Sequence, residues 1–340
     1  MNRKKSKRPT ISDVAEKAGV SIATVSRVLN QNIPVADNTR KNVIKAIKDL
    51  HYRPVFAAQN LARSTTNTIG LILPQISGDY FPSILKGIEA ALKEYGYRLL
   101  VYSTQYEHES SYDEILQFGD HITDGLIIFT NALDDKALHQ YYEAQLPLVL
   151  LFQKPPGGLA IPEVGIKNET GAYQIVEHLI KIHECEKIVF IKGPINNSDS
   201  KWREIGYKKA LADNHIEAVS ERIIRGDYNM DTARKNVAKF IDREIAFDAI
   251  FSADDESAIG AIQALDSKGI RVPEEVAVVG FDDIYLAKFI NPPLTTVSVP
   301  LEMVGKRAVK QIIKVIHGEE VQRLVLLPTK PVYRRSCGCE

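Results

Sequence analysis

The sequence has few cysteines and no long apolar stretch. Only 3 of its 340 residues are cysteine, which is too few for the disulfide framework of a small secreted protein. No apolar run reaches the roughly 18 residues that a membrane-spanning helix needs. The basic N-terminal segment is not followed by an apolar stretch, so we expect no secretory signal and a cytoplasmic protein.

Familiar catalytic motifs are also missing. The patterns His-Glu-x-x-His, Gly-x-Ser-x-Gly and Gly-x-x-x-x-Gly-Lys-Ser/Thr do not occur, so neither a zinc peptidase, a serine hydrolase nor a phosphate-binding loop is indicated. Paired aspartates occur at 134–135, 254–255 and 282–283, but adjacent residues at a strand end rarely aim at one substrate atom. We therefore expect no enzyme and no cofactor, and a doubly wound α/β enzyme is the rival interpretation.

Two of the three cysteines, Cys337 and Cys339, lie in the last four residues. Two thiolates are half of a zinc site, and the sequence shows no pair of histidines at ligand spacing beside them. The sequence therefore predicts a frayed C-terminal tail and no metal site.

Basic residues are concentrated at the N-terminus. Residues 1–63 contain 13 Lys or Arg against 4 Asp or Glu, a net charge of +9. The remainder contains 30 Lys or Arg against 39 Asp or Glu, a net charge of −9. This asymmetry indicates that the N-terminal segment binds a polyanion and the remainder does not. A solvated basic tail is the alternative.

The N-terminal segment has the pattern of short helices joined by a turn. Thr10 and Asp13 have the spacing of a capping box, which predicts that a helix begins directly after Thr10. Gly19 follows as a helix stop, because glycine adopts the left-handed backbone without steric cost. Ser21 then caps a second helix, and a third helix over about 38–50 closes the core. Two short helices around a tight turn with glycine form a helix-turn-helix.

The second helix of this motif, over 22–29, is expected to lie in the major groove of DNA with its first residues at the base edges. Arg27 can donate two hydrogen bonds to a guanine, and Ile22 can pack against a thymine methyl group. Ser21 and Thr24 are better placed for phosphates. A helical hairpin that binds nothing is the alternative.

These residues are part of a longer pattern that resembles the DNA-binding region of the LacI/GalR family of bacterial repressors. The pattern consists of residues 10–30 (TISDVAEKAGVSIATVSRVLN) and continues at residues 39–40, 50, 52–54 and 57–62. Such a long, ordered pattern is highly specific. The resemblance implies a sequence-specific transcriptional regulator, and more narrowly a repressor.

The resemblance also divides the chain into a head (residues 1–53), a hinge helix or linker (residues 54–66) and a core (residues 67–340). In the family the hinge becomes helical on the operator, and a leucine at the position of Leu61 wedges between bases. An apolar wedge in the minor groove unstacks a base step and bends the duplex; packing of Leu61 on the core is the alternative. The residues expected to contact DNA are Ile11, Ser12, Ser21, Ile22, Ala23, Thr24, Ser26, Arg27, Asn30, Thr39, Tyr52, Ala58 and Leu61.

In the core, short apolar runs alternate with amphipathic segments. Runs such as 68–74, 125–129 and 249–252 predict buried strands, and the segments between them predict helices. This alternation is typical of parallel sheets covered on both faces. A second series begins near Gly165, which predicts two doubly wound α/β lobes. Ligands of such folds bind at the carboxyl ends of the strands.

The core resembles the two-lobed, periplasmic-binding-protein-like core of the same family over its whole length. The resembling segments are 70–74, 80–81, 87–89, 124–127, 203–207, 252–255, 279–283 and 293–296. The resemblance implies lobe 1 at about 67–162 and 292–324, lobe 2 at about 163–291 and 325–340, and a small effector that controls DNA binding. The residues expected to contact the effector are Tyr80, Phe81, Phe152, Asn197, Trp202, Arg203, Tyr228, Asp254 and Asp282.

The residue types at these positions suit a sugar-like ligand. Carboxylates accept hydrogen bonds from paired hydroxyls, a guanidinium donates, and an aromatic face stacks. Asp254, Asp282, Arg203 and Trp202 supply these groups. Each also has a structural explanation, because an aspartate after a strand often caps the next helix and Arg203 can be a surface charge.

The sequence departs from many sugar-responsive relatives after the fourth strand. Phe152-Gln153 stands where those relatives carry Asp-Arg. The missing carboxylate disfavours a neutral hexose, and Lys154, Lys201 and Arg203 favour an anionic ligand. A sugar acid of the ketodeoxygluconate type or a sugar phosphate is therefore expected.

Together these features predict a homodimer that binds a pseudo-palindromic operator in double-stranded DNA, with one head on each half-site. Binding should weaken steeply with salt, and the effector should change DNA affinity by about 1–3 kcal/mol. No membrane partner is expected, and the DNA-bound protein should be found in the nucleoid. A phosphoprotein co-repressor in place of a small effector is one alternative. A sugar-transport protein and a DNA binder without effector are the others.

Overall fold

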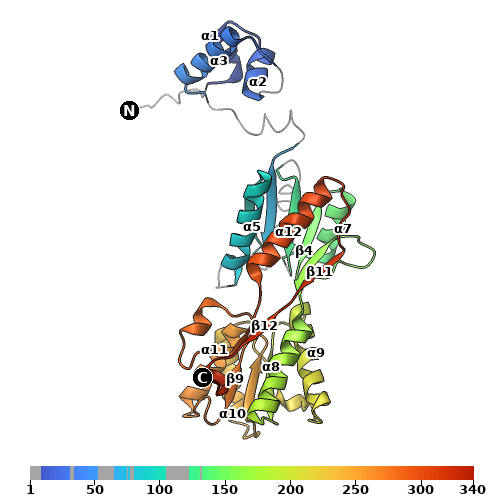
Figure 1. Cartoon of the computed structure of the whole chain (residues 1–340), viewed down its shortest axis with the longest axis vertical. Helices are drawn as coiled ribbons and strands as arrows, with labels where there is room; N and C mark the ends of the chain where they lie inside the picture. Colours follow the sequence, from blue (N-terminus) through green and yellow to red (C-terminus); the bar gives the residue numbers. More distant parts are fainter. Residues whose placement is uncertain are drawn as a thin grey trace. The chain divides into compact units, whose positions relative to one another are not determined.

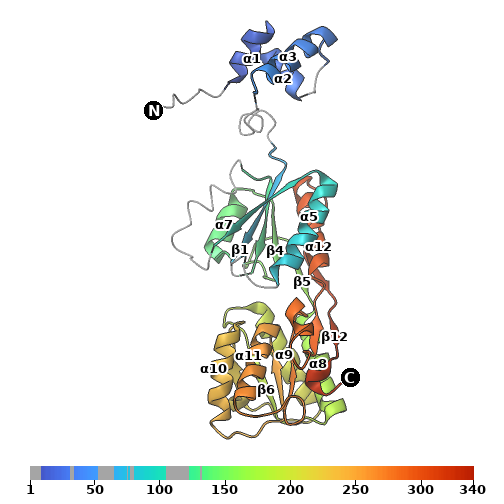
Figure 2. The same ribbon diagram turned by 90° about the vertical axis from the view of Figure 1, so that its left-hand side faces the viewer.

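The computed structural model describes residues 9–30, 34–52, 65–74, 76, 80–104, 122–130 and 132–340. The chain divides into two compact units, residues 1–66 and 67–340, whose elements are labelled in Figure 1 and Figure 2. The predicted DNA contacts Ala58 and Leu61 lie outside the described residues. No helix in the described ranges combines the length and the apolar character needed to cross a membrane.

Three helices form the head: α1 (Ile11–Ala18), α2 (Ile22–Asn30) and α3 (Asp37–Asp49). The predicted capping box is present, since the Asp13 N–H donates to Thr10 Oγ1 (3.4 Å) and the Thr10 N–H donates to Asp13 Oδ2 (2.6 Å). Gly19 ends α1 with a φ of 66°. The Thr24 N–H donates to Ser21 Oγ (3.2 Å) at the start of α2. Local caps therefore set both helices of the predicted helix-turn-helix.

A small apolar core holds the three helices of the head together. Its buried members are Val14, Ala15, Val25, Val28, Val43 and Ala46. Burying a valine side chain contributes about 1.5–3 kcal/mol relative to leaving it in water, so the contacts among the three helices stabilise helices that would be marginal alone.

The first sheet of the core has six parallel strands in the order β11-β5-β4-β3-β1-β2. The strands are β1 (Thr68–Leu73), β2 (Arg98–Ser103), β3 (Gly125–Phe129), β4 (Leu148–Leu151), β5 (Glu163–Ile166) and β11 (Leu324–Leu327). Helices α5 (Phe81–Tyr95) and α12 (Leu301–Ile316) cover one face, and α7 (Asp135–Glu143) covers the other (Figure 2). The sheet and these three helices form the first lobe.

Glycines allow α5 and α12 to pack closely. A Cβ at Gly87 would overlap the backbone oxygen of Glu302, and a Cβ at Gly305 would lie 2.5 Å from the backbone oxygen of Ile84. Larger residues at these positions would push the two helices apart. The close contact fixes α12 on the first lobe although more than half of the core separates it from α5 in sequence.

The second sheet has four parallel strands in the order β7-β6-β8-β9. Its strands are β6 (Ile188–Lys192), β7 (Ile223–Arg225), β8 (Ala249–Ser252) and β9 (Ala277–Val279). Helices α8 (Asn168–His183) and α9 (Ser198–Asp213) pack together on one face, and α10 (Met230–Ile241) and α11 (Asp255–Ser267) on the other (Figure 1). This sheet and these four helices form the second lobe, so the predicted pair of doubly wound lobes is confirmed.

Short elements complete the core. They are the antiparallel pair β10 (Thr296–Ser298) and β12 (Lys330–Val332) and the 3₁₀ turns η1 (Ser220–Arg222), η2 (Tyr285–Lys288) and η3 (Arg335–Cys337). The chain passes from lobe to lobe three times: after β5, through β10, and after β11.

The predicted lobe boundaries at 163 and 325 differ from the observed sheets. Residues 163–166 and 324–327 pair with each other in the first sheet, whereas the prediction assigned 163–166 and most of 324–327 to lobe 2. The short apolar sequence of a strand does not encode which of two parallel sheets it joins. The two predicted passages from lobe 1 to lobe 2 were therefore placed a few residues too early in the sequence.

The predicted frayed tail is wrong. Ser336 is fully buried; its hydroxyl donates to the Val278 oxygen (2.6 Å) and accepts from the Thr295 N–H (2.8 Å). Cys337 is 2% exposed. The tail is ordered because Ser336 hydrogen-bonds to the end of β9 and to the segment before β10.

Candidate functional site

The exposed face of α2 carries the predicted base contacts. Ile22 is 50% exposed, and Ala23 and Arg27 are exposed as well. Ala23 and Arg27 are four residues apart and therefore share one face of the helix. An apolar side chain beside a guanidinium on one exposed helical face matches the chemistry of base edges in the major groove.

The other described DNA candidates differ in exposure. Ser12 and Ser21 are exposed, and Thr24, Ser26 and Thr39 are half-buried. Ile11 and Tyr52 pack against the core of the head, and burial raises the pKa of Tyr52. Asn30 is the last residue of α2, and its side chain lies outside the described part. A role of these residues in DNA binding stays a prediction.

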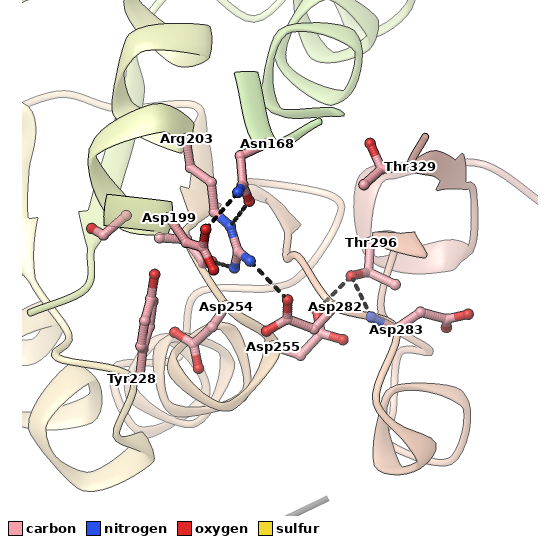
Figure 3. Close-up of polar contacts among 12 residues, drawn as sticks. Asn168, Asp199, Arg203, Tyr228, Asp254, Asp255, Asp282, Asp283, Thr296 and Thr329 are labelled. Carbon is pink, nitrogen blue, oxygen red and sulfur yellow. Dashed lines mark hydrogen bonds and ion pairs between the residues drawn. The ribbon is translucent and has the colours of Figure 1, made fainter. Parts of the chain in front are cut away.

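In the core, a buried polar cluster surrounds Arg203 (Figure 3). The Arg203 side chain is only 3% exposed, and its Nη2 lies 3.1 Å from Asp282 Oδ1. Arg203 Nε donates to Asn168 Oδ1 (2.8 Å), and Nη1 donates to the Ala253 oxygen. The guanidinium carbon lies 3.8 Å from the centroid of the Phe281 ring. Protein groups thus hold the guanidinium on its edges and on one face.

Sequence reasoning missed two members of this cluster. The Asn197 side chain caps α9 by accepting from a backbone N–H of its first turn (2.9 Å), so the helix begins at Ser198. Asp199 and Arg203 are consequently four residues apart on one helix face. Asn168 Nδ2 donates to Asp199 Oδ1 (2.7 Å). The sequence contained two signals for Asp199, which are the helix cap at Asn197 and the four-residue spacing to Arg203. No local pattern in the sequence indicated Asn168.

Asp254 and Asp255 play different roles. Asp254 caps α11 by accepting the Ser257 N–H at Oδ2 (3.1 Å), while its other oxygen, Oδ1, is buried without a hydrogen-bond partner. Asp255 uses both oxygens, because Oδ2 accepts the Ile284 N–H (2.9 Å) and Oδ1 accepts the Thr296 hydroxyl. Asp255 is therefore structural, whereas one buried oxygen of Asp254 accepts no hydrogen bond.

The cluster contains more carboxylates than one guanidinium can neutralise. Burial raises the pKa of Asp199 to about 6, against the opposing effect of Arg203. Burial also raises the pKa of Asp282 to about 7, although Arg203 is its ion-pair partner. Burial raises the pKa of Asp254 as well. A ligand that donates hydrogen bonds suits this surplus of buried acceptors.

Aromatic side chains of the first lobe form a wall near this cluster. Rings of Tyr80, Phe81, Phe129 and Phe152 contact one another with centroids 5.2 to 6.2 Å apart. Burial raises the pKa of Tyr80 well above its ordinary value, and the charges of Asp282 and Asp199 raise it further. Ser198 Oγ donates to the Phe152 oxygen (3.0 Å) and joins the two lobes at this point.

Two further candidates behave differently. Tyr228 donates to Asn197 Oδ1 (3.2 Å) and so lies beside the Arg203 cluster. Trp202 is 50% exposed whereas the adjacent Arg203 is buried, because consecutive helix residues face different directions. Lys154 and Lys201 are exposed. Contact of any of these residues with an effector stays a prediction.

Comparison with known proteins decides the family. Residues 66–335 match the profile described as periplasmic binding proteins and sugar binding domain of LacI family, and residues 10–55 match that of bacterial regulatory proteins, lacI family. The chain belongs to the LacI family. This confirms the family predicted from the sequence and the predicted fold of a helix-turn-helix head and a two-lobed α/β core.

Individual LacI-family members resemble the chain over nearly its whole length. It is 36% identical over 331 residues to the HTH-type transcriptional regulator RegA of Clostridium acetobutylicum, covering 96% of this chain and 99% of that one. It is similar to the lac repressor dimer bound to operator and the anti-inducer ONPF, with 28% identity, a TM-score of 0.85 and coverage of 97% and 99%. It is similar to the CelR–cellobiose complex, with 29% identity, a TM-score of 0.75 and coverage of 97% and 100%. The LacI-family relatives are DNA-binding transcriptional regulators and not enzymes, so the rival interpretation as an α/β enzyme is set aside.

Proposed function

We propose that the protein is a repressor that binds a pseudo-palindromic operator as a homodimer and is controlled by a neutral, sugar-like effector in its core. The buried, unpartnered Oδ1 of Asp254 carries the effector proposal. A buried polar group left without a hydrogen bond costs about 1–3 kcal/mol, and more when it is charged. A hydroxyl of a bound ligand would supply the missing donor.

The charge of the cluster favours a neutral polyhydroxylated ligand over the sugar acid expected from the sequence. Arg203 already donates to, or pairs with, three protein oxygens. An added carboxylate would have to compete with Asp282 for the guanidinium and would meet Asp199 and Asp254 at short range. Hydroxyl groups can donate to these carboxylates, and the aromatic wall offers apolar surface to a sugar ring. The cellobiose complex of the relative CelR supports this class.

The DNA proposal rests on the exposed face of α2. In helix-turn-helix proteins such a face reads one half-site, and a symmetric dimer reads two half-sites about one helical turn apart. The lac repressor relative binds its operator as a dimer, which supports the same arrangement here. Effector binding would change DNA affinity only if the two core conformations bind the effector unequally.

The decisive variant for the effector is Asp254→Asn. Asparagine caps a helix as well as aspartate does, so α11 keeps its cap while the free acceptor becomes an NH₂ donor. A hydrogen bond to a charged group contributes about 1.5–3 kcal/mol, so the affinity for a neutral sugar should fall roughly tenfold to 150-fold. The matched control is Asp231→Asn in the first turn of α10, where the side chain is 70% exposed; it should leave the affinity unchanged.

Binding is measured by calorimetry with neutral mono- and disaccharides, sugar acids, sugar phosphates and purines. DNA affinity is measured by fluorescence anisotropy on a duplex selected from a random pool, with and without the ligand that binds. Selective binding of a sugar acid would refute the neutral-ligand proposal. Equal affinity of the Asp254→Asn variant and the Asp231→Asn control would refute the assignment of the effector to the Arg203 cluster. A bound ligand that leaves DNA affinity unchanged would refute the regulatory role.

A further inference from the structure

Four potential metal ligands meet where the C-terminal tail packs on α8. His178 and His183 come from α8, and Cys337 and Cys339 come from the tail. One ligand atom from each lies within 4.8 Å of every other. None of the four belongs to the Arg203 cluster. We propose that these four side chains bind one Zn²⁺ ion in tetrahedral geometry.

Four of the six distances between the ligand atoms lie close to the values for that geometry. With Zn–N of about 2.0–2.1 Å and Zn–S of about 2.3 Å, a tetrahedral ion places two nitrogens about 3.3 Å apart and a nitrogen and a sulfur about 3.6 Å apart. The His178 and His183 Nε2 atoms are 3.1 Å apart. Cys339 Sγ lies 3.4 Å from His178 Nε2 and 3.5 Å from His183 Nε2. Cys337 Sγ lies 3.7 Å from His178 Nε2.

The backbone between the two cysteines brings both sulfurs to one place. Gly338 has a φ of 103°, and a Cβ at this position would lie 3.3 Å from two atoms of the His183 ring. Glycine is the residue that adopts such a backbone without strain. It allows Cys337 and Cys339 to approach the same pair of histidines from one tight turn.

Neighbouring groups hold the ligands in place. The His178 ring stacks on Tyr333 with centroids 4.1 Å apart. Thr295 Oγ1 lies 3.0 Å from Cys337 Sγ, and the buried Ser336 anchors the tail at the preceding residue. Such supporting contacts orient metal ligands in known sites.

The types of the four ligand atoms indicate which metal ion the site would bind. Two thiolates and two imidazoles favour Zn²⁺ over Mg²⁺, Ca²⁺ or Mn²⁺, which prefer oxygen ligands. Four protein ligands fill a tetrahedral shell and leave no position for a substrate, which is typical of a structural site. Because the tail follows β12, the ion would fix the last crossing of the chain to α8 of the second lobe.

The test uses the full chain, purified under reducing conditions and loaded with Zn²⁺. We expect one zinc per chain by elemental analysis after passage over a weak chelator, a higher Tm than that of the metal-free protein, and a tetrahedral thiolate spectrum when Co²⁺ replaces Zn²⁺. Cys339→Ser and His183→Gln should each weaken zinc binding at least about 100-fold. Cys185→Ala, which removes the remaining cysteine, is the control and should keep one zinc per chain. Far-UV circular dichroism checks that each variant is folded.

Three results would overturn the proposal. The first is folded wild-type protein that holds no zinc after zinc loading and passage over the weak chelator. The second is a disulfide between Cys337 and Cys339 that persists in protein purified under reducing conditions. Such a disulfide would make the two cysteines a redox-active pair and not metal ligands. The third is zinc binding that the folded Cys339→Ser and His183→Gln variants retain in full.

Discussion

Replacing Asp282 with asparagine should change how the stability of the core depends on pH. Burial raises the pKa of Asp282 from 3.8 to about 7, so the folded core binds this proton more tightly than the unfolded chain does. The contribution of this proton to stability is complete below about pH 4 and is lost as the pH rises through about 7. Between about pH 8 and pH 5.5 the folded state takes up nearly one proton that the unfolded state does not, which stabilises it by about 2 kcal/mol.

The assay compares two proteins at two pH values. Urea unfolding of the wild type and of Asp282→Asn is followed by the fluorescence of Trp202, which is the single tryptophan and lies in α9 of the core. Asparagine carries no titrating proton and, like aspartate, tolerates a positive φ such as the 113° at this position. Lowering the pH from 8 to 5.5 should raise the free energy of unfolding of the wild type by about 2 kcal/mol more than that of the variant.

This double difference removes the effects of titrating groups that lie away from Asp282. Burial lowers the pKa values of His178 and His183, and these histidines destabilise the fold as the pH falls, but they do so equally in both proteins. Asp231→Asn is the exposed control and should show a double difference near zero. A double difference below about 0.5 kcal/mol for Asp282→Asn would mean that Arg203 keeps Asp282 ionised at both pH values, and the raised pKa of this carboxyl would be wrong.

Two other variants test the head and the packing of the first lobe. Arg27→Ala should lower affinity for the selected operator by about 1–3 kcal/mol and reduce the ratio of specific to non-specific DNA binding in anisotropy titrations, whereas Lys45→Ala on α3 should leave that ratio unchanged. If the Arg27→Ala and Lys45→Ala variants have the same ratio of specific to non-specific binding, Arg27 does not contact a base. Gly87→Ala should destabilise the core by about 1–3 kcal/mol in urea, because its Cβ meets the backbone of Glu302; Gly157→Ala, in open space, is the control that should not.

The head was predictable from sequence because its signals are local. The Thr10 cap, the Gly19 stop and the Ser21 cap lie within a few residues of the helices that they bound. The predicted third helix over about 38–50 differs by one residue at each end from the observed Asp37–Asp49. Local signals of this kind do not depend on the rest of the fold.

The effector site was only partly predictable. The second-lobe candidates Asp254 and Asp282 follow the ends of β8 and β9, and Arg203 of α9 lies together with them. Asn168 joins them from the first turn of α8, through a contact between residues 35 positions apart. Such pairing depends on how α8 packs against α9, which no local pattern in the sequence reports.

The tail was misread for the same physical reason. Cys337 and Cys339 are more than 150 residues from the histidines that they meet. A search for ligands at short spacing cannot find a site that the tertiary fold assembles from a helix end and a chain end.

The first sheet also constrains the order in which the chain can fold during synthesis. Its sixth strand, β11, pairs with β5, and α12 covers α5, so both pieces leave the ribosome only after the entire second lobe. The four strands of the second sheet are contiguous, from β6 to β9, and that lobe can close first. Until 324–327 emerge, β5 remains an open strand edge of the kind that invites pairing with other chains. The first lobe is therefore the part of the nascent chain that keeps an unpaired strand edge until synthesis is nearly finished.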